Sequence, residues 1–144
     1  MSIPLEQVQY TPYTGDGDID SWIAQACAII GVNSQPYWDA GYKTLTYRES
    51  TYNPNAINIT DDNAVGSIVA DGNPQGCSRG IAQCIPATFA SYYAENTSLS
   101  IYDPVANIAA SMQYIMATYG VSSDGSNLQA NVQQADPTQD PHGY

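Results

Sequence analysis

Apolar residues recur at intervals of three and four in four segments of the chain, which is the spacing of one face of an α-helix. These segments predict helices over residues 20–31, 34–49, 86–93 and 103–120. We expect Asp20 or Ser21 to cap the first helix and the glycine at the end of its range to stop it. The last helix is the best specified, because Asp103 and Pro104 open it and Gly120 closes it.

The stretch between residues 53 and 83 has a different composition. It is rich in Asn, Asp, Gly and Pro, with short β-branched pieces at 57–60 and 67–69. This composition is typical of loops, and the two pieces indicate a small hairpin. Together the segments predict an α+β domain that is predominantly helical.

The two ends of the chain differ from its centre. Residues 1–18 contain two prolines and an alternating Gly-Asp run, and they predict an unstructured N-terminal lead-in. Residues 121–144 are rich in Ser, Gln, Asp and Pro and hold few large aliphatic side chains, so they are interpreted as a linker or a C-terminal tail. The folded domain is therefore expected over residues 19–120.

The charge balance narrows the classes of partner. Three Lys and Arg residues stand against fourteen Asp and Glu, and the resulting net charge of −11 repels phosphate backbones. Nucleic acid is therefore not an expected partner. No apolar run reaches the ~18 residues that a membrane span needs. The stretch from Met1 to Gly15 has neither the basic nor the apolar region of a signal peptide, so we expect no membrane partner and no such peptide in this chain.

One carboxylate falls in an unexpected place on the second predicted helix, which is expected to start at Ser34. The apolar stripe of that helix is Trp38, Tyr42 and Leu45. Four residues further on, the same face carries Glu49. Burial in a partly dry cleft raises the pKa of a carboxyl group, so that it can donate a proton near neutral pH. The alternatives are an ion pair with Arg48 or Arg79, or a solvated helix end.

Other candidate groups say less about function. Cys77 and Cys84 bracket a short segment and are compatible with a disulfide or with two free thiols. The single histidine, His142, lies in the predicted tail, so neither a histidine-based triad nor a metal site is expected. The acids of the central loop lack the spacing of an EF-hand and are interpreted as solvated: Asp61, Asp62 and Asp71.

Three motifs follow one another along the chain. They are RESTYNPNAIN at 48–58, SRGIAQCIPATF at 78–89 and IYDPVANI at 101–108, and Tyr114 and Tyr119 come after them. The ordered set resembles the soluble lytic transglycosylase domain of the lysozyme-like superfamily, especially versions in actinobacterial phage tape-measure proteins or endolysins. The resemblance covers about residues 20 to 120. It implies a lysozyme-like fold.

The resemblance also implies roles for individual residues. Glu49 matches the catalytic acid/base of the family, and Ser50 shapes the loop behind it. Gln83 ends a Gly-Ile-Ala-Gln sequence similar to the family's Gly-Leu-Met-Gln, whose glutamine lines the sugar groove. Asn58 is assigned to the same groove, and Tyr114 matches a tyrosine that faces the glutamate. A polar stripe on the last helix agrees with a cleft or a solvated face: Asn107, Ser111, Tyr114 and Thr118.

The chain departs from the family pattern at three places. Ala82 stands where many members have methionine, which reduces one apolar wall of the groove. Residues 65–77 resemble an insertion and are expected to form a flap over the groove or a longer loop. An Ala-Tyr-Asn motif that many members carry late in the domain is absent.

The implied activity is peptidoglycan lytic transglycosylation, which needs one carboxylate, no metal and no cofactor. One alternative is a hydrolase, a muramidase or chitinase, in which a second carboxylate of the central loop positions water. A non-catalytic cell-wall-binding module and a structural virion segment are further alternatives. The expected partner is the glycan strand of peptidoglycan. The chain is expected to belong to a larger phage protein or lysis system, located in the virion or at the host cell wall or periplasmic space.

Overall fold

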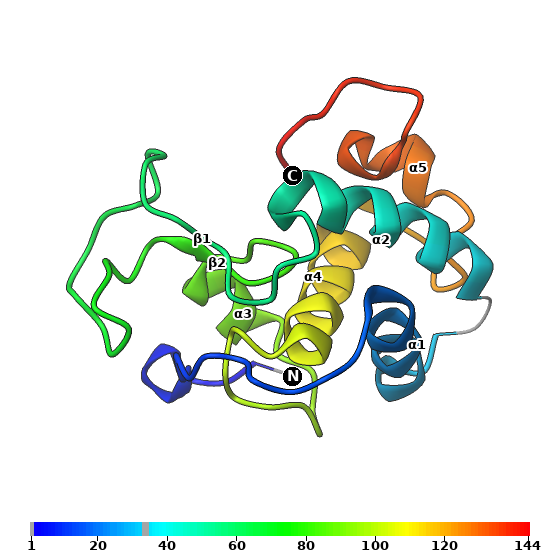
Figure 1. The fold of residues 1–144 in the computed structure, drawn as a ribbon. Coiled ribbons are helices and arrows are strands. Elements are labelled where there is room, and N and C mark those ends of the chain that lie inside the picture. Colours follow the sequence, from blue (N-terminus) through cyan, green and yellow to red (C-terminus); the bar gives the residue numbers. More distant parts are fainter. Residues whose placement is uncertain (1, 33–34) are drawn as a thin grey trace.

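The computed structural model describes residues 2–32 and 35–144, and most of its regular structure is helical (Figure 1). The elements in chain order are η1 (Leu5–Gln7), α1 (Ile19–Ile30), α2 (Gln35–Ser50), β1 (Ile57–Asn58), β2 (Ser78–Arg79), α3 (Pro86–Ser91), α4 (Pro104–Tyr119), α5 (Leu128–Asn131) and η2 (Gln133–Ala135). The prediction of a mostly helical α+β domain is confirmed. Within the described residues, no helix is long and apolar enough to cross a membrane.

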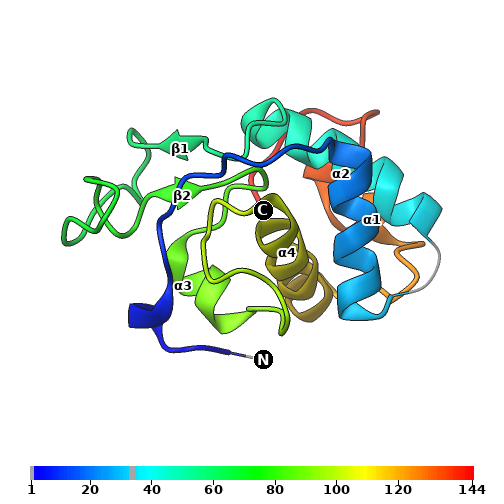
Figure 2. The ribbon, with the colours of Figure 1, turned by 60° about the horizontal axis from the view of Figure 1, so that its bottom comes forward.

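Helix α4 packs against α1 and α3, and α2 packs against α1, α5 and η2 (Figures 1 and 2). The predicted ends of α4 are confirmed: the Asp103 carboxylate accepts from the Ala106 N–H at 2.9 Å, and Gly120 adopts the left-handed conformation at φ 67°. One face of α4 buries Ile108, Met112 and Ile115 in a hydrophobic core that also holds buried residues of α1 and α2. Its other face contributes alanines to a second core with α3 and the N-terminal segment.

Helix α1 starts slightly earlier than predicted. Its N-cap is Asp18, whose Oδ1 accepts from the Ser21 N–H at 2.9 Å, and the prediction of Asp20 or Ser21 as the cap is wrong. Asp20 lies inside the helix and pairs with Lys43 at 2.6 Å instead. The predicted stop at Gly31 is confirmed, with a left-handed φ of 73°.

The apolar stripe of α2 is confirmed, because Trp38, Tyr42 and Leu45 are all fully buried. The predicted start of this helix at Ser34 lies outside the described residues. The helix ends at Ser50, so that Glu49 occupies its last turn.

The central loops form a smaller sheet than the two β-branched pieces indicate. Strands β1 and β2 pair antiparallel, with Ile57 opposite Arg79 and Asn58 opposite Ser78. The piece at 67–69 is not part of this sheet, and its Ile68 makes only an isolated bridge to Pro74. Residues 59–77 extend away from the helices as irregular loops (Figure 1).

Both ends of the chain pack onto the domain, unlike the predicted unstructured lead-in and tail. In the N-terminal segment Val8 is buried, the Gln9 N–H donates to the Leu99 carbonyl at 2.9 Å, and the Ile101 N–H donates back to the Gln9 carbonyl at 3.0 Å. In the C-terminal segment the buried apolar residues are Leu128, Val132 and Ala135.

The packing of the C-terminal segment depends on a glycine in α2. A Cβ at Gly41 would collide with the Leu128 side chain, so the absence of a side chain there lets α5 lie against α2. Trp38 adds a hydrogen bond from its indole N–H to the Ser123 carbonyl at 2.9 Å. A few well-placed apolar residues thus hold a segment whose overall composition is that of a linker.

Candidate active site

Glu49 is the acidic residue whose position in the fold favours acid chemistry. It continues the buried stripe of α2 into the last turn, and its side chain is half-buried. Burial raises the pKa of its carboxyl group above the ordinary value. A hydrogen bond from the Gln134 Nε2 to the Glu49 Oε2, at 2.9 Å, acts in the opposite direction and offsets part of that rise.

The three basic side chains of the protein have other partners than Glu49. Arg48 donates to the backbone carbonyls of Gln133, Gln134 and Gln139 at 3.3, 3.4 and 2.7 Å. Lys43 pairs with Asp20 and Asp39, and Arg79 pairs with Asp71. Throughout the described residues, no ion pair therefore holds Glu49 in its charged form, and the alternative of a pair with Arg48 or Arg79 is wrong.

The turn after Glu49 connects the end of α2 to the second motif. Ser50 Oγ donates to the Ile81 carbonyl at 2.7 Å and accepts from the Asn53 N–H at 3.2 Å. Thr51 and Tyr52 follow in the left-handed region, at φ 55° and 62°, which is uncommon for residues with a branched or bulky side chain. Ser50 thus fixes a tight and strained loop directly after the glutamate.

The second motif is fastened to α4 by one buried amide. Asn107 donates to the carbonyls of Arg79 and Ile101 at 3.0 and 2.8 Å, and its Oδ1 accepts from the Ala82 N–H at 2.8 Å. Gly80 has φ 88°, and a Cβ there would collide with the Asn107 side chain. The motif therefore needs glycine at this position for two independent reasons.

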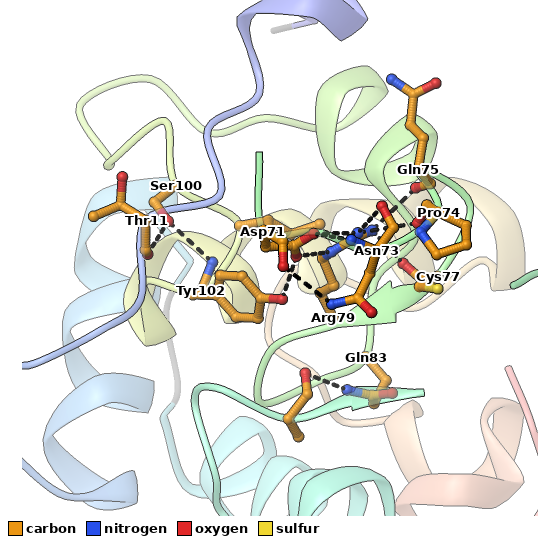
Figure 3. Close-up of polar contacts among 12 residues, drawn as sticks. Thr11, Asp71, Asn73, Pro74, Gln75, Cys77, Arg79, Gln83, Ser100 and Tyr102 are labelled. Atoms are coloured by element: carbon orange, nitrogen blue, oxygen red, sulfur yellow. Dashed lines mark hydrogen bonds and ion pairs between the residues drawn. The ribbon is translucent and has the colours of Figure 1, made fainter. Parts of the chain in front are cut away.

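Gln83 ends this turn at a φ of 59°. Its Nε2 donates to the carbonyls of Ala56 and Gly80 at 3.1 and 2.9 Å, which ties the residue before β1 to the motif (Figure 3). The side chain is therefore fixed before any ligand binds.

A pocket of about 150 Å³ brings Gln83 and Tyr114 together. Its lining also includes Asn63, Ser78, Cys84, Ile85, Thr88 and Tyr144. The Tyr114 ring lies in edge or tilted contact with three other tyrosine rings, those of Tyr92, Tyr119 and Tyr144. Such aromatic walls combine apolar faces with polar tips, which suits a sugar ring.

Two groups of this pocket lie within electrostatic reach of Glu49. Burial, with the Glu49 charge as a second cause, raises the pKa of the Cys84 thiol to about 12. Burial also raises the pKa of the Tyr144 phenol well above its ordinary value, and Glu49 is among the smaller causes. The Glu49 charge therefore acts on two of the residues that line the pocket, although Glu49 itself lies outside that lining.

The polar stripe of α4 is mostly internal. Asn107 and Ser111 are fully buried, and Thr118 is exposed, so only Tyr114 of the four lines the pocket. Ser111 Oγ lies 2.7 Å from both the Tyr42 and the Tyr144 hydroxyl groups, and Tyr144 donates to the Ala82 carbonyl at 2.7 Å. This chain of hydroxyl groups joins α2, α4 and the C-terminal segment beneath the pocket.

Asn58 and the loop acids lie apart from this pocket lining. Asn58 Oδ1 accepts from the backbone of Thr60 and Asp61 at 2.9 and 3.2 Å and so closes its own turn. Its assignment to the groove stays a prediction. Asp61 and Asp62 are exposed.

Asp71 belongs to a buried cluster around Arg79 (Figure 3). The Arg79 guanidinium donates to both Asp71 oxygens at 2.7 and 3.0 Å, and to the carbonyls of Asn73, Pro74, Gln75 and Cys77. Burial alone would raise the pKa of Asp71, but the donors Arg79 and Tyr102 bring it below its ordinary value. This cluster anchors the loop of residues 65–77, so Asp71 is not free for acid or base chemistry.

The sequence does not predict two residues of the site, Gln134 and Tyr144. Both lie in the segment interpreted as a linker or a tail. The only sequence signal for that segment is the spacing of Leu128, Val132 and Ala135, which matches one helical face. The cysteines are all free and buried: Cys27, Cys77 and Cys84. Among the residues that the structure describes, no three His, Cys, Asp or Glu side chains gather in a group that could hold a metal ion.

Comparison with known proteins agrees with the motifs. The family model of the transglycosylase SLT domain matches residues 33–132. The uncharacterized protein YqbO of Bacillus subtilis (strain 168) is 34% identical over 104 residues. That match covers 72% of this chain but only 6% of the relative, so the chain spans a small part of that protein's length. No solved structure matches. On the strength of the family match, the chain belongs to the SLT transglycosylase domain family and has its lysozyme-like fold.

Proposed function

We propose that this domain is a peptidoglycan lytic transglycosylase that uses Glu49 as its only catalytic carboxyl group. The observation that carries the proposal is the state of Glu49: its pKa is raised by burial, and it has no cationic partner among the described residues. A carboxyl group in this state keeps its proton closer to neutral pH and can donate it. Membership of the SLT family supports the same chemistry.

In the proposed reaction, protonated Glu49 donates to the glycosidic oxygen between N-acetylmuramic acid and N-acetylglucosamine. The bond from that oxygen to C1 breaks, and the substrate's own N-acetyl group stabilises the positive charge that develops at C1. The Glu49 carboxylate then removes the proton of the C6 hydroxyl group as that oxygen forms a bond to C1. The product carries a 1,6-anhydromuramyl end, Glu49 regains its proton, and no water is consumed.

The hydrolase alternative needs a second carboxylate close to the first. Asp71 is committed to Arg79 and Tyr102, and Asp61 and Asp62 are exposed on the loop. Burial raises the Glu49 pKa and the hydrogen bond from Gln134 lowers it, and within the described residues no other acid is among the causes of the shift. These contacts favour the reaction that needs a single carboxylate.

The substrate site in this proposal is the pocket beside Glu49. Gln83 and Tyr114 both line it and provide a fixed amide and an aromatic wall for the sugar. Ser50 holds the glutamate's loop in place. The Asn58 role in binding is part of the proposal, although its side chain closes a turn in the absence of ligand.

The test is release of soluble fragments from purified peptidoglycan by the wild-type domain and by Glu49→Gln. The Glu49→Gln protein is expected to fold and to lose at least about 10²-fold in rate, the usual contribution of a general acid. Asp62→Asn is the matched control, because it removes an exposed acid of the loop, and it should keep full activity. If Glu49→Gln releases fragments at the wild-type rate, the proposal is wrong. A wild-type domain that binds peptidoglycan without releasing fragments points instead to a wall-binding module.

We further propose that the domain acts on the host cell wall as part of a larger phage protein or lysis system. The match covers 6% of the length of the Bacillus subtilis relative, which agrees with a domain inside a long protein. The phage setting rests on the resemblance of the motifs. Antibodies against the domain should detect it in purified virions or in the lysing cell envelope, and detection in neither would overturn this setting.

A further inference from the structure

The last described residues supply a contact to the candidate acid that lies outside the family match. That match ends at residue 132, whereas Gln134 belongs to the segment 133–144, here called the C-terminal strap. We propose that Gln134 is a positioning residue that keeps the Glu49 Oε2 as a hydrogen-bond acceptor and thereby leaves the acidic proton on Oε1. The inference rests on the proposed function, because it concerns how Glu49 acts as an acid.

The contacts of Gln134 fix the direction of its amide. Its side chain donates from Nε2 to the Glu49 Oε2 at 2.9 Å and accepts at Oε1 from the His142 backbone N–H at 2.7 Å. A backbone N–H can only donate, so the amide oxygen must face His142 and the NH₂ group must face Glu49. Gln134 is only 6% exposed, which leaves little competition from water for these two bonds.

Contacts along the strap and at its last residue hold it in place. Arg48, the neighbour of Glu49 on α2, donates to three backbone carbonyls of the strap, one of which belongs to Gln134 itself. At the other end, Tyr144 donates to the Ala82 carbonyl in the second motif. Figure 1 shows the end of the strap returning to the end of α2 where Glu49 lies.

The consequence for the acid follows from the chemistry of the amide. An NH₂ group is a donor and cannot accept a proton, so an oxygen that accepts from it is disfavoured as the protonated one. The proton is thus directed to Oε1. In the second half of the reaction the same amide donates to the carboxylate form and stabilises it, which suits a group that serves as acid and then as base.

The titratable groups that interact with Glu49 remain neutral in the range where a carboxyl group titrates. These are the Cys84 thiol, which follows β2, and the Tyr144 phenol of the strap, and the pKa of each is raised by burial. Arg48, beside Glu49 on α2, directs its guanidinium to backbone carbonyls of the strap and not to Glu49. The midpoint of the Glu49 titration therefore depends on the burial of its carboxyl group and on the hydrogen bond from Gln134.

The chain is well suited to a direct test, because its glutamates are Glu6, Glu49 and Glu95. With ¹³C at the glutamate carboxyl carbon, an NMR titration of the full chain shows three signals, and Glu49→Gln removes the one to be assigned. In Gln134→Leu, we expect the Glu49 midpoint to move to higher pH, because the donor that favours the charged form is lost. Gln133→Leu is the matched control: Gln133 is the exposed neighbour on the strap, and its side chain donates to the Asp140 carbonyl rather than to Glu49.

Activity provides the second readout. We expect Gln134→Leu to lose roughly tenfold in kcat/KM near the optimum, the effect of about one hydrogen bond to a charged group. The alkaline limb of its pH profile should move upward with the NMR midpoint, and Gln133→Leu should change neither. If Gln134→Leu does not fold, the unbranched Gln134→Met serves in its place. A folded Gln134 variant whose Glu49 midpoint equals the wild-type midpoint would overturn the inference, even where Glu49→Gln is inactive. An active Glu49→Gln protein would overturn the proposed function instead.

Discussion

Arg48 and Glu49 are neighbours on α2, yet their side chains serve different partners. Arg48 donates to backbone carbonyls of the C-terminal strap, while Glu49 accepts from the Gln134 amide of that same strap. The cation is thus fully occupied by neutral carbonyl groups, and the carboxyl group is left without a counter-charge. This division keeps the pKa of Glu49 raised although an arginine is adjacent in sequence.

Replacing Arg48 by leucine should loosen the strap. We expect a loss of about 1–3 kcal/mol in the free energy of unfolding, because the variant removes a charged donor from three backbone carbonyls of the strap, one of them part-buried. Urea denaturation measures the loss, and hydrogen exchange should show faster exchange at the His142 amide. Lys43→Leu on the same helix is the comparison, because its ion pairs are on the surface, and it should have little effect. Equal stability of Arg48→Leu and wild type would contradict the anchoring role.

Gly41→Ala tests how the C-terminal segment packs on α2. Alanine favours a helix over glycine by up to ~1 kcal/mol, but here its Cβ would collide with the fully buried Leu128. We expect a net destabilisation of about 1–3 kcal/mol, as for other overpacked cores. Gly143→Ala has open space around its Cβ and should leave the urea midpoint unchanged. A stabilised Gly41→Ala protein would show that α5 does not pack against this position.

The ion pair of Arg79 with Asp71 should make the free energy of unfolding depend on pH in the acidic range. The folded-state pKa of Asp71 lies below its ordinary value, so its contribution is present above the ordinary pKa of an aspartate and is lost as pH falls through the folded pKa. At neutral pH, Asp71→Asn should cost about 3–5 kcal/mol, because Arg79, with no exposed side-chain surface, loses its counter-charge. The difference from wild type should shrink as the pH is lowered below about 4. A difference that stays constant with pH would argue against the pair.

Glu49→Gln should affect stability in the opposite direction to activity. The folded-state pKa of Glu49 is raised, so ionisation opposes folding, and wild type loses stability as pH rises from the unfolded to the folded pKa. The variant carries no charge there and should be the more stable protein at neutral pH, with the two converging in acid. Thermal unfolding at several pH values measures this. A destabilised variant at neutral pH would indicate that Glu49 has a structural role.

The sequence predicts the parts of this fold whose signals are local. Helix α4 has its cap, its proline and its terminal glycine within one segment, and the stripe of α2 leads directly to Glu49. The C-terminal segment was not predictable in this way, because its burial depends on Leu128 meeting a glycine 87 positions earlier in the chain. The contact of Gln134 with Glu49 depends in turn on that packing.

The central claim concerns the product, and one digestion tests it directly. Peptidoglycan is digested with the domain in H₂¹⁸O, and the soluble muropeptides are analysed by mass spectrometry. Transglycosylation by Glu49 alone predicts 1,6-anhydromuramyl ends, about one water lighter than reducing ends, with no ¹⁸O incorporated at the cleaved bond. Reducing ends that carry ¹⁸O would contradict the account and would establish a hydrolase with a second catalytic carboxylate.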